Sequence, residues 1–225
     1  MQSDIFTKEQ KSNHIPLADR LRPENLEEYV GQETLVGADG VLRKLLESDV
    51  FPSIILWGPP GVGKTTLARI IASELSAKFL QVSAVTSGKK DLQNVVHQAK
   101  EVRQFSQGKE TLLFIDEIHR FNKIQQDYLL PFVEDGTIIL IGATTENPSF
   151  EIIAPLLSRS RVFTLDRHAP EDLEIILKRG IEYLEKSLDV EIEFEEGMKN
   201  ILIQKSNGDP RMLLNALEIA VGLSS

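Results

Sequence analysis

The chain has 225 residues, of which 41% are hydrophobic and 26% are charged, and its formal net charge at pH 7 is −9. This balance predicts an ordinary globular protein with one sizeable core, or with one core and a small satellite domain. The absence of cysteine excludes disulfides and thiolate metal sites, and no apolar run approaches the roughly 20 residues that cross a bilayer. An acidic chain can bind nucleic acid only through a local cluster of Lys and Arg.

The chain begins with a polar stretch of mixed charge. Residues 1–15 show no periodic apolar pattern, and they are neither a secretory signal nor an Arg-rich transit peptide. We therefore expect a flexible N-terminal extension over residues 1–15. Ordered structure is expected to begin near Pro16, with Leu17, Leu21 and Leu26 as the first buried anchors.

Residues 16–166 alternate short apolar runs with segments of helical periodicity. The run Ser53–Trp57, bounded by Pro52 and a Gly-Pro-Pro-Gly turn, is typical of a buried parallel strand. Alternating strands and helices require crossover connections, so this stretch predicts a parallel sheet covered by helices on both faces. The expected strands are 53–57, 79–83, 111–116, 137–143 and 161–165, and the expected helices are 41–46, 64–75, 91–105, 125–134 with a bend at Pro131, and 150–157.

The pattern changes after Asp166, where helical periodicity dominates. We therefore expect a three-layer α/β domain over residues 16–166, followed by a small all-α domain over residues 167–225. The helices expected in the second domain are 171–187, 195–205 and 211–223, with a weak strand signal at 190–194.

A glycine-rich loop lies between the expected strand 53–57 and the expected helix 64–75, and it matches the phosphate-loop pattern at every fixed position. Glycines let successive backbone N–H groups surround an anion, and the following helix directs its unpaired N–H groups at the β-phosphate. Lys64 is expected to bridge the β- and γ-phosphates of ATP, and the Thr65 hydroxyl to ligate Mg²⁺. The expected nucleotide-binding residues of this loop are Gly58, Pro59, Pro60, Gly61, Val62, Gly63, Lys64 and Thr65.

Two acids follow the apolar run Leu112–Ile115, which places them at the carboxyl edge of the sheet, where ligands bind in open α/β folds. Asp116 is expected to hold Mg²⁺ through its water shell, since Mg²⁺ keeps several waters and takes few carboxylates. Glu117 is expected to accept a proton from the attacking water or to orient that water. His119 has no companion ligands for a metal and is expected to be structural.

A polar segment, Gly142–Asn147, follows the apolar strand next to the acid-bearing one. A hydroxyl or amide there can hydrogen-bond the γ-phosphate or the attacking water, although a simple capped strand exit is the alternative. Thr145 is slightly favoured over Thr144 and Asn147 for this contact.

A second candidate for γ-phosphate contact follows Gly208. Asp209 is a good N-cap and Pro210 a good first helical residue, so Arg211 falls in the first turn of a helix. A cation is unfavourable at that end of the helix dipole unless an anion is near. The anion can be a phosphate or any carboxylate.

Together these motifs resemble the AAA+ ATPases of the clamp-loader clade, which are P-loop NTPases. The stretches HRFNK and TTENPSF are similar to the replication-associated recombination protein A / Werner helicase-interacting protein family in particular. This resemblance runs from about Pro16 to Leu223. The segments that carry it are Gly58–Thr66, Leu112–Arg120, Gly142–Asn147, Ser158–Ser160 and Gly208–Arg211.

The resemblance implies an AAA+ α/β domain and a helical lid, with ATP and Mg²⁺ between them. It places Val30 in the adenine pocket and adds Thr66 to the nucleotide-binding residues. Arg211 would be a sensor acting from the lid. Arg159 would be an arginine finger that reaches the γ-phosphate of a neighbouring subunit, so hydrolysis would depend on assembly. Without the resemblance, Arg159 would be interpreted as a solvated surface cation.

Members of this family act on DNA at stalled or damaged replication forks, and DNA stimulates their ATPase activity. The resemblance therefore implies a Mg-ATP-dependent ATPase whose partners are further copies of itself, DNA and replication or repair proteins, and not a membrane. It implies a nuclear location in a eukaryote and a nucleoid-associated cytoplasmic one otherwise. The family's C-terminal oligomerisation domain is not in this sequence, so we expect a fragment that ends after the lid. The candidate DNA contacts are Lys89, Lys90, Lys100, Arg103, Arg120 and Lys123.

Three other AAA+ functions are open to this sequence. A protein-threading unfoldase normally carries an aromatic residue in the loop after the second strand, where this chain has Ala84–Lys90 with two lysines and no aromatic. A hexameric helicase or branch-migration motor often inserts a hairpin before the sensor strand, and only residues 135–137 are free for it here. A nucleotide-dependent scaffold without DNA action is disfavoured by the intact phosphate loop and acids.

Overall fold

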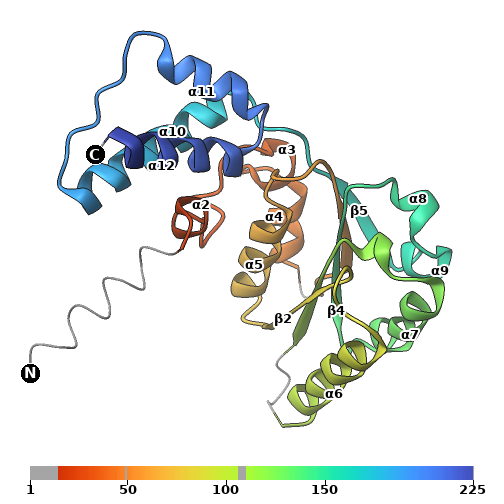
Figure 1. Cartoon of the computed structure of the whole chain (residues 1–225). Coiled ribbons are helices and arrows are strands. Elements are labelled where there is room, and N and C mark those ends of the chain that lie inside the picture. Colours follow the sequence, from red (N-terminus) through yellow and green to blue (C-terminus); the bar gives the residue numbers. More distant parts are fainter. Residues whose placement is uncertain (1–14, 49, 106–109, 225) are drawn as a thin grey trace, which may run out of the picture. The chain divides into compact units, whose positions relative to one another are not determined.

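The computed structural model of the chain describes residues 15–48, 50–105 and 110–224, so the expected flexible extension, apart from its last residue, lies outside the described residues. The chain divides into two compact units (Figure 1). One is Glu24–Asp166, and the other combines the residues before Glu24 with those from Arg167 onward. Each unit has a hydrophobic core of its own.

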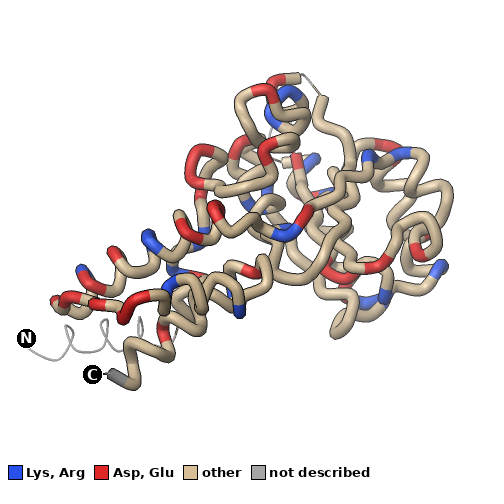
Figure 2. The backbone as a smooth tube through the Cα atoms, turned by 90° about the horizontal axis from the view of Figure 1, so that it is seen from above, with Lys and Arg blue, Asp and Glu red and all other residues tan. Residues whose placement is uncertain are grey.

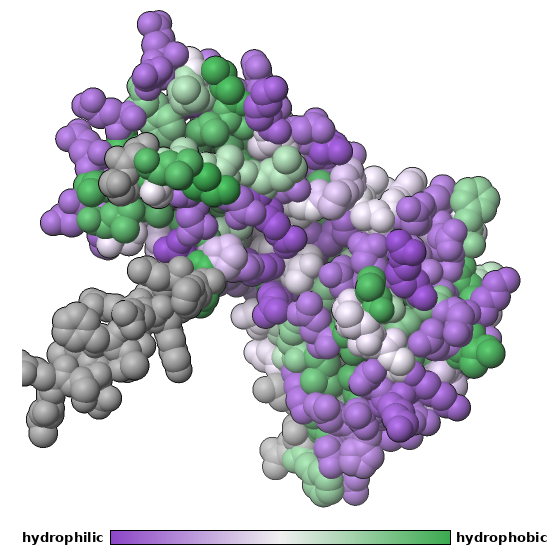
Figure 3. Space-filling model, in the orientation of Figure 1, coloured by the Kyte–Doolittle hydropathy of each residue, from purple (hydrophilic) through white to green (hydrophobic). Residues whose placement is uncertain are grey.

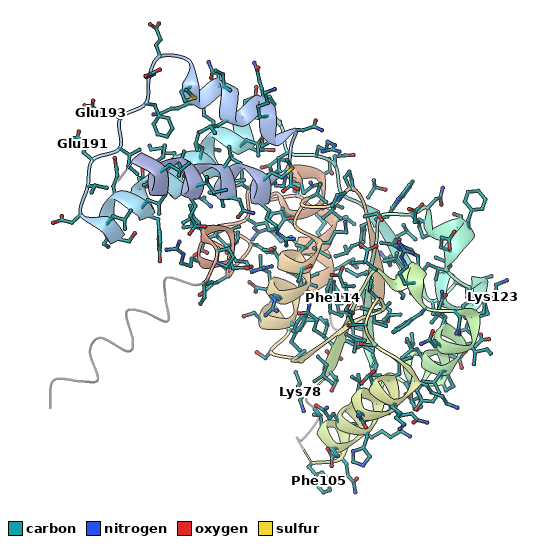
Figure 4. The ribbon with its side chains drawn as sticks, viewed as in Figure 1. Lys78, Phe105, Phe114, Lys123, Glu191 and Glu193 are labelled. Atoms are coloured by element: carbon teal, nitrogen blue, oxygen red, sulfur yellow. The ribbon has the colours of Figure 1, made fainter. Side chains whose placement is uncertain are left out.

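The strands of the first unit are β1 (Ser53–Trp57), β2 (Lys78–Ser83), β3 (Thr111–Asp116), β4 (Ile139–Thr144) and β5 (Ser160–Thr164). They form one parallel sheet in the order β2-β3-β4-β1-β5. The central strands β1, β3 and β4 are apolar and almost wholly buried, as expected for a sheet covered on both faces. Phe114 of β3 lies within this sheet (Figure 4) and is fully buried.

Helices cover both faces of the sheet (Figure 1). They are α3 (Glu33–Val36), α4 (Val41–Leu46), α5 (Lys64–Glu74), α6 (Lys89–Phe105), η1 (Ile118–Arg120), α7 (Lys123–Glu134), α8 (Pro148–Glu151) and α9 (Ala154–Leu157). Alternate side chains of β1 serve the two faces: Ile54 and Leu56 pack with α4 and α5, whereas Ile55 packs with α6, α7 and α9. The predicted three-layer α/β architecture is confirmed.

The single helix expected at 150–157 is wrong, because the structure has two short helices, α8 and α9, with extended backbone between them. The buried side chain of Gln126 in α7 accounts for the break. It donates to the carbonyl of Glu151 at 3.0 Å and accepts from the N–H of Ile153 at 2.9 Å. It also donates to the carbonyl of Phe121 at 3.0 Å. Backbone groups that would extend one helix are thus satisfied by a side chain from another element.

The connection between α7 and β4 is short. β4 begins at Ile139 rather than at 137, because Thr137 is still part of a turn in which its N–H donates to the Asp135 carboxylate at 2.8 Å. Residues 135–138 alone join the two elements, so the described chain carries no hairpin before β4.

The second unit contains α2 (Leu17–Arg20), α10 (Pro170–Leu188), α11 (Met198–Ser206) and α12 (Pro210–Ser224). The expected α/β domain begins at residue 16, whereas the structure groups residues 16–23 with these helices. Leu17 is fully buried in the helical core, and its N–H donates to the carboxylate of Glu218 at 2.9 Å. Arg20 forms an ion pair with the same carboxylate. These contacts come from the far end of the chain, so local pattern could not indicate them.

The segment between α10 and α11 is extended but pairs with no strand among the described residues, so the weak strand expected at 190–194 is not formed. Ile192 and Phe194 pack on the helical core, whereas Glu191 and Glu193 project away from the helices (Figure 4). α11 begins later than expected because Gly197, with φ of 81°, precedes its first residue.

Charged and apolar side chains share the surface of both units. Acidic and basic residues are interspersed along the backbone (Figure 2). Apolar side chains reach the surface on α12, where Met212, Ile219 and Leu223 are more than half exposed (Figure 3). None of the described helices is both long enough and apolar enough to span a membrane.

Replacing Gln126 with Met tests the bridge between α7 and the α8–α9 segment. Gln126→Met keeps the volume but leaves three backbone groups without their partner, at about 1–3 kcal/mol each, so we expect the free energy of unfolding to fall by about 3 kcal/mol or more. Urea unfolding measures the loss.

Gln125 provides the matched control, because its side chain completes only a capping box with Asn122 at the start of α7. Gln125→Met is expected to cost about 1 kcal/mol or less. Equal losses in the two variants would contradict the special role of Gln126.

Candidate active site

Three strands end side by side at one edge of the sheet, because β4 lies between β1 and β3 and all three are parallel. The phosphate loop follows β1, Asp116 ends β3 and Thr144 ends β4. The N–H of Gly58 donates to the carbonyl of Thr144 at 3.1 Å, so the loop starts against the end of β4. The phosphate loop, the acids and the segment with Thr145 therefore meet at the edge where open α/β sheets bind ligands.

The phosphate loop turns where glycine permits it. Gly61 and Gly63 have φ of 80° and 95°, in the left-handed region that favours glycine. A Cβ on Gly58 would lie 2.2 Å from the carbonyl oxygen of Leu165, so that position also excludes a side chain. Because α5 begins at Lys64, its unpaired N–H groups lie directly after the loop, an arrangement that suits an anion.

Tyr29 packs on this loop, a contact that the sequence motifs do not indicate. Its hydroxyl donates to the carbonyl of Val62 at 3.2 Å, and a Cβ on Gly63 would lie 2.4 Å from its oxygen. Burial raises the pKa of Tyr29, so the hydroxyl keeps its proton and remains a donor. Tyr29 directly precedes Val30, the residue expected in the adenine pocket. The segment expected to contact adenine therefore also packs on the phosphate loop.

The ammonium of Lys64 is held inside its own loop. Lys64 is 7% exposed, and its Nζ donates to the carbonyls of Gly58 and Pro59, each at 2.7 Å. Burial lowers the pKa of Lys64, and the nearby charges of Glu117 and Asp116 oppose part of that shift. Burial therefore has a larger effect on the pKa of this ammonium than the two acids do.

The two acids leave β3 with different backbone conformations. Asp116 is its last residue, whereas Glu117 has left-handed φ and ψ of 54° and 44°, a conformation that is strained for a residue with a side chain. Among the described residues, no group of three or more His, Asp or Glu side chains could hold a metal ion by itself. Thr65 and Asp116 still fit Mg²⁺, which prefers oxygen ligands, keeps waters and completes its shell with substrate phosphates.

His119 connects the second acid to β4. Its Nε2 lies 3.3 Å from Oε2 of Glu117, and its Nδ1 lies 2.9 Å from Oγ1 of Thr144. Thr144 is fully buried, and its hydroxyl oxygen also accepts the N–H of Glu146 at 3.0 Å. The sequence motifs do not indicate this link, because Thr144 lies 25 residues from His119, at the end of another strand.

The three polar candidates after β4 are in different environments. The hydroxyl of Thr144 is engaged with His119, and the side chain of Asn147 accepts the N–H of Ser149 at 3.0 Å as the cap of α8. Thr145 is half-buried, and its hydroxyl has no hydrogen-bond partner in the part of the chain that the structure describes. Of the three, Thr145 has the side chain most available to a ligand.

The two expected arginines lie in different units. Arg159, just after α9, donates to the carbonyl of Pro155 at 3.0 Å and pairs with Glu134 at 2.6 Å on the surface of the first unit. Arg211 lies exposed in the first turn of α12, in the second unit. The carboxylate of Asp209 accepts the N–H of Arg211 at 2.8 Å, as predicted for an N-cap.

Two of the six candidate DNA contacts are engaged with other side chains of the first unit. Nζ of Lys100 lies 4.8 Å from the ring centroid of Phe132, and Arg103 lies 3.3 Å from a carboxylate oxygen of Asp135. The other candidates are exposed, at the start of α6 and on either side of the start of α7. These are Lys89, Lys90, Arg120 and Lys123.

Residues 54–167 match the model of a family described as "ATPase family associated with various cellular activities (AAA)". This match spans half of the chain and contains the phosphate loop, both acids and Thr145. The chain belongs to the AAA family. The edge of the sheet that carries the phosphate loop and the acids therefore lies within an AAA ATPase domain.

Similar full-length proteins support this assignment. The chain is 46% identical over 217 residues to "ATPase WRNIP1" of Dictyostelium discoideum, which covers 96% of this chain and 24% of that protein. It is also 46% identical over 210 residues to "Replication-associated recombination protein A" of Haemophilus influenzae, which covers 93% of this chain and 47% of that protein. The chain thus spans less than half the length of these relatives.

Solved structures with the same fold include RuvB of Thermotoga maritima. The structure of one of its point variants is 32% identical, with a TM-score of 0.68 over 86% of this chain and 63% of that chain. A second structure, named as the RuvB Holliday junction branch migration motor, is 31% identical, with a TM-score of 0.69 over 86% of this chain and 63% of that chain. These likenesses confirm the predicted AAA+ fold.

Replacing Lys64 with Met tests the burial of its ammonium in the nucleotide-free protein. Because burial lowers the pKa of Lys64, the unfolded chain binds this proton more tightly, and the wild type gains stability as pH rises from the lowered pKa towards 10.5. Lys64→Met lacks this gain.

We therefore expect the free energy of unfolding of Lys64→Met, relative to the wild type, to decrease as pH rises from neutral towards 10.5. Urea unfolding of both proteins at a series of pH values measures the difference. A difference that does not change with pH would contradict a buried ammonium.

Proposed function

We propose that this chain is the nucleotide-hydrolysing part of a Mg-ATP-dependent AAA+ ATPase that acts on DNA at stalled or damaged replication forks. The observation that carries the proposal is the meeting of the phosphate loop, the acid pair and Thr145 at one edge of the sheet. Two relatives, one named as an ATPase and the other as a replication-associated recombination protein, support both halves of it.

The residues of this edge have complementary roles in phosphoryl transfer. Backbone N–H groups of the loop and of the start of α5 would bind phosphate oxygens, and Lys64 would neutralise charge between the β- and γ-phosphates. Glu117 would orient the attacking water or accept its proton. Thr145 would donate to the γ-phosphate or to that water, while Val30 and Thr66 would complete the nucleotide contacts.

The proposal includes Mg²⁺ held by two residues. The Thr65 hydroxyl would be a direct ligand, and Asp116 would hold waters of the ion's shell. Both side chains are half-buried, which leaves space for those waters. When bound, the ion neutralises charge on the phosphate oxygens.

Hydrolysis is proposed to require a second copy of the chain. Arg159 lies on the surface of the first unit with Glu134 as its ion-pair partner. As an arginine finger, it would exchange that carboxylate for the γ-phosphate bound to a neighbouring subunit. Arg211 would contact the γ-phosphate from the helical unit as a lid sensor.

The action on DNA separates this proposal from a nucleotide-dependent scaffold or a protein-remodelling ATPase. The loop between β2 and α6 leads into two exposed lysines, Lys89 and Lys90, and lacks an aromatic residue, which suits a phosphate backbone better than a polypeptide. The likeness to RuvB supports the fold rather than branch migration, since residues 135–138 leave no room for a hairpin before β4.

Steady-state ATP turnover, with and without forked or single-stranded DNA, tests the function. We expect turnover that rises with DNA in the wild type. Glu117→Gln is expected to bind ATP normally and to lose turnover by about 10²–10⁴-fold, the contribution of a positioned base. Binding without turnover in the wild type would point to missing assembly, whereas absence of ATP binding would overturn the proposal.

Charge reversal at the start of α6 tests the DNA contact. We expect Lys89→Glu with Lys90→Glu to weaken binding to forked DNA and to flatten its dependence on salt, with a log–log slope smaller by about 2. Fluorescence anisotropy at several salt concentrations measures both effects.

The matched control reverses two exposed lysines of the helical unit, Lys186→Glu with Lys205→Glu, which changes the net charge equally. We expect a much smaller loss of DNA affinity in that variant. Equal losses would indicate an effect of overall charge, and normal DNA binding by the α6 variant would remove these lysines from the interface.

A further inference from the structure

We propose that His119 is a positioning residue for the Glu117 carboxylate, anchored through the buried Thr144 hydroxyl to the end of β4. The inference rests on the proposed ATPase function and adds to it a residue outside the expected set of site residues. Its basis is one continuous series of contacts, from Glu117 through His119 to Thr144 and the backbone of Glu146.

The donors and acceptors of this series agree with one another. The N–H of Glu146 donates to Oγ1 of Thr144 at 3.0 Å, and the Thr144 hydroxyl can then donate to Nδ1 of His119 at 2.9 Å. Nε2 of His119 is left to carry the ring proton, and this nitrogen lies 3.3 Å from Oε2 of Glu117. The other acceptor for the Thr144 hydroxyl, the Glu146 carbonyl, is farther away at 3.2 Å.

Glu117 needs an external partner to define its direction. Its left-handed backbone departs from β3, so the strand does not set the path of its side chain. In the described part of the chain, His119 is the partner that the Glu117 carboxylate contacts. The side chain of Glu117 is 30% exposed and that of His119 is 7% exposed, so a partly exposed carboxylate lies against a nearly buried imidazole.

His119 is itself held firmly against β4. Its neighbour Ile118 is fully buried, and a Cβ on Gly142 would lie 2.9 Å from Cδ1 of Ile118. A side chain at position 142 would displace the end of the Ile118 side chain, so glycine there favours the close packing of η1 on the strand. This packing brings the imidazole within reach of Thr144, two residues further along β4.

Thr144 joins the two halves of the site. Its hydroxyl holds His119, and its carbonyl accepts the N–H of Gly58, the first residue of the phosphate loop. Thr144 therefore contacts both the imidazole that would position the Glu117 carboxylate and the loop that would bind the phosphates. The next residue is Thr145, so a ligand contact there would act directly beside the anchor.

Two pairs of variants test the link by ATP turnover. A Gln side chain at position 119 reaches the place of Nε2, whereas an Asn side chain reaches only the place of Nδ1. We expect His119→Asn to lower kcat by about tenfold or more, a part of what a positioned base contributes, with an unchanged affinity for ATP. His119→Gln is expected to retain more of kcat.

The anchor is tested in the same way. Thr144→Val removes only the hydroxyl and is expected to lower kcat, whereas Thr144→Ser keeps it and is expected to resemble the wild type. His119→Asn combined with Thr144→Val is expected to be little worse than His119→Asn alone, because both changes break one series of contacts. Wild-type kcat in both His119 variants, or losses confined to ATP affinity, would overturn the proposal.

A measurement without turnover separates this proposal from the ATPase function. In nucleotide-free protein labelled with ¹⁵N-histidine, the imidazole signals of the four histidines can be assigned by substitution. We expect His119 to carry its proton on Nε2, Glu117→Gln to shift the Nε2 signal, and Thr144→Val to shift the Nδ1 signal. Unaffected signals would overturn the link, whereas the expected shifts in a protein that does not bind ATP would overturn only the ATPase function.

Discussion

The parallel pairing of β1, β3 and β4 is the constraint on which the rest of this molecule depends. Because the three strands run in one direction, their carboxyl ends share an edge, and segments far apart in sequence become neighbours there. An antiparallel β3 would carry Asp116 and Glu117 to the opposite edge. A shift of one residue in β1 would exchange Ile54 and Ile55 between the two apolar clusters on the opposite faces of the sheet. Burial on both faces therefore fixes the register of β1.

Several groups of the proposed phosphate site are already held in place before a nucleotide binds. Lys64 is buried with two carbonyl oxygens as acceptors, and the charges of the two acids oppose only part of the lowering of its pKa by burial. The neutral hydroxyl of Tyr29 donates to the carbonyl of Val62 in the same loop. The strained backbone of Glu117 belongs to the same arrangement, since it directs a carboxylate along η1 towards His119 rather than along β3.

Sequence alone predicted the sheet well, because its central strands are apolar runs bounded by Gly, Pro or charged residues; β1 and β3 have the predicted limits. The phosphate loop and acids were predictable for a related reason, since their chemistry is contained in short contiguous motifs. Failures arose where a distant residue decides the local structure. Gln126 divides the helix expected at 150–157, and Glu218 draws Leu17 into the helical unit. The link through His119 was not predicted for the same reason, because its anchor, Thr144, lies 25 residues away.

The helical unit is discontinuous in sequence, and this has a consequence for the order in which the protein is made. Leu17 leaves the ribosome early, but the carboxylate that its N–H contacts lies 201 residues later. The α/β unit between them has all of its own strands available by Thr164. Domains generally fold as units during synthesis. The segment with α2 is therefore made first, and it lacks its partner helix α12 while the sheet folds. The emergence of α12 is then the event that joins the two parts of the helical unit.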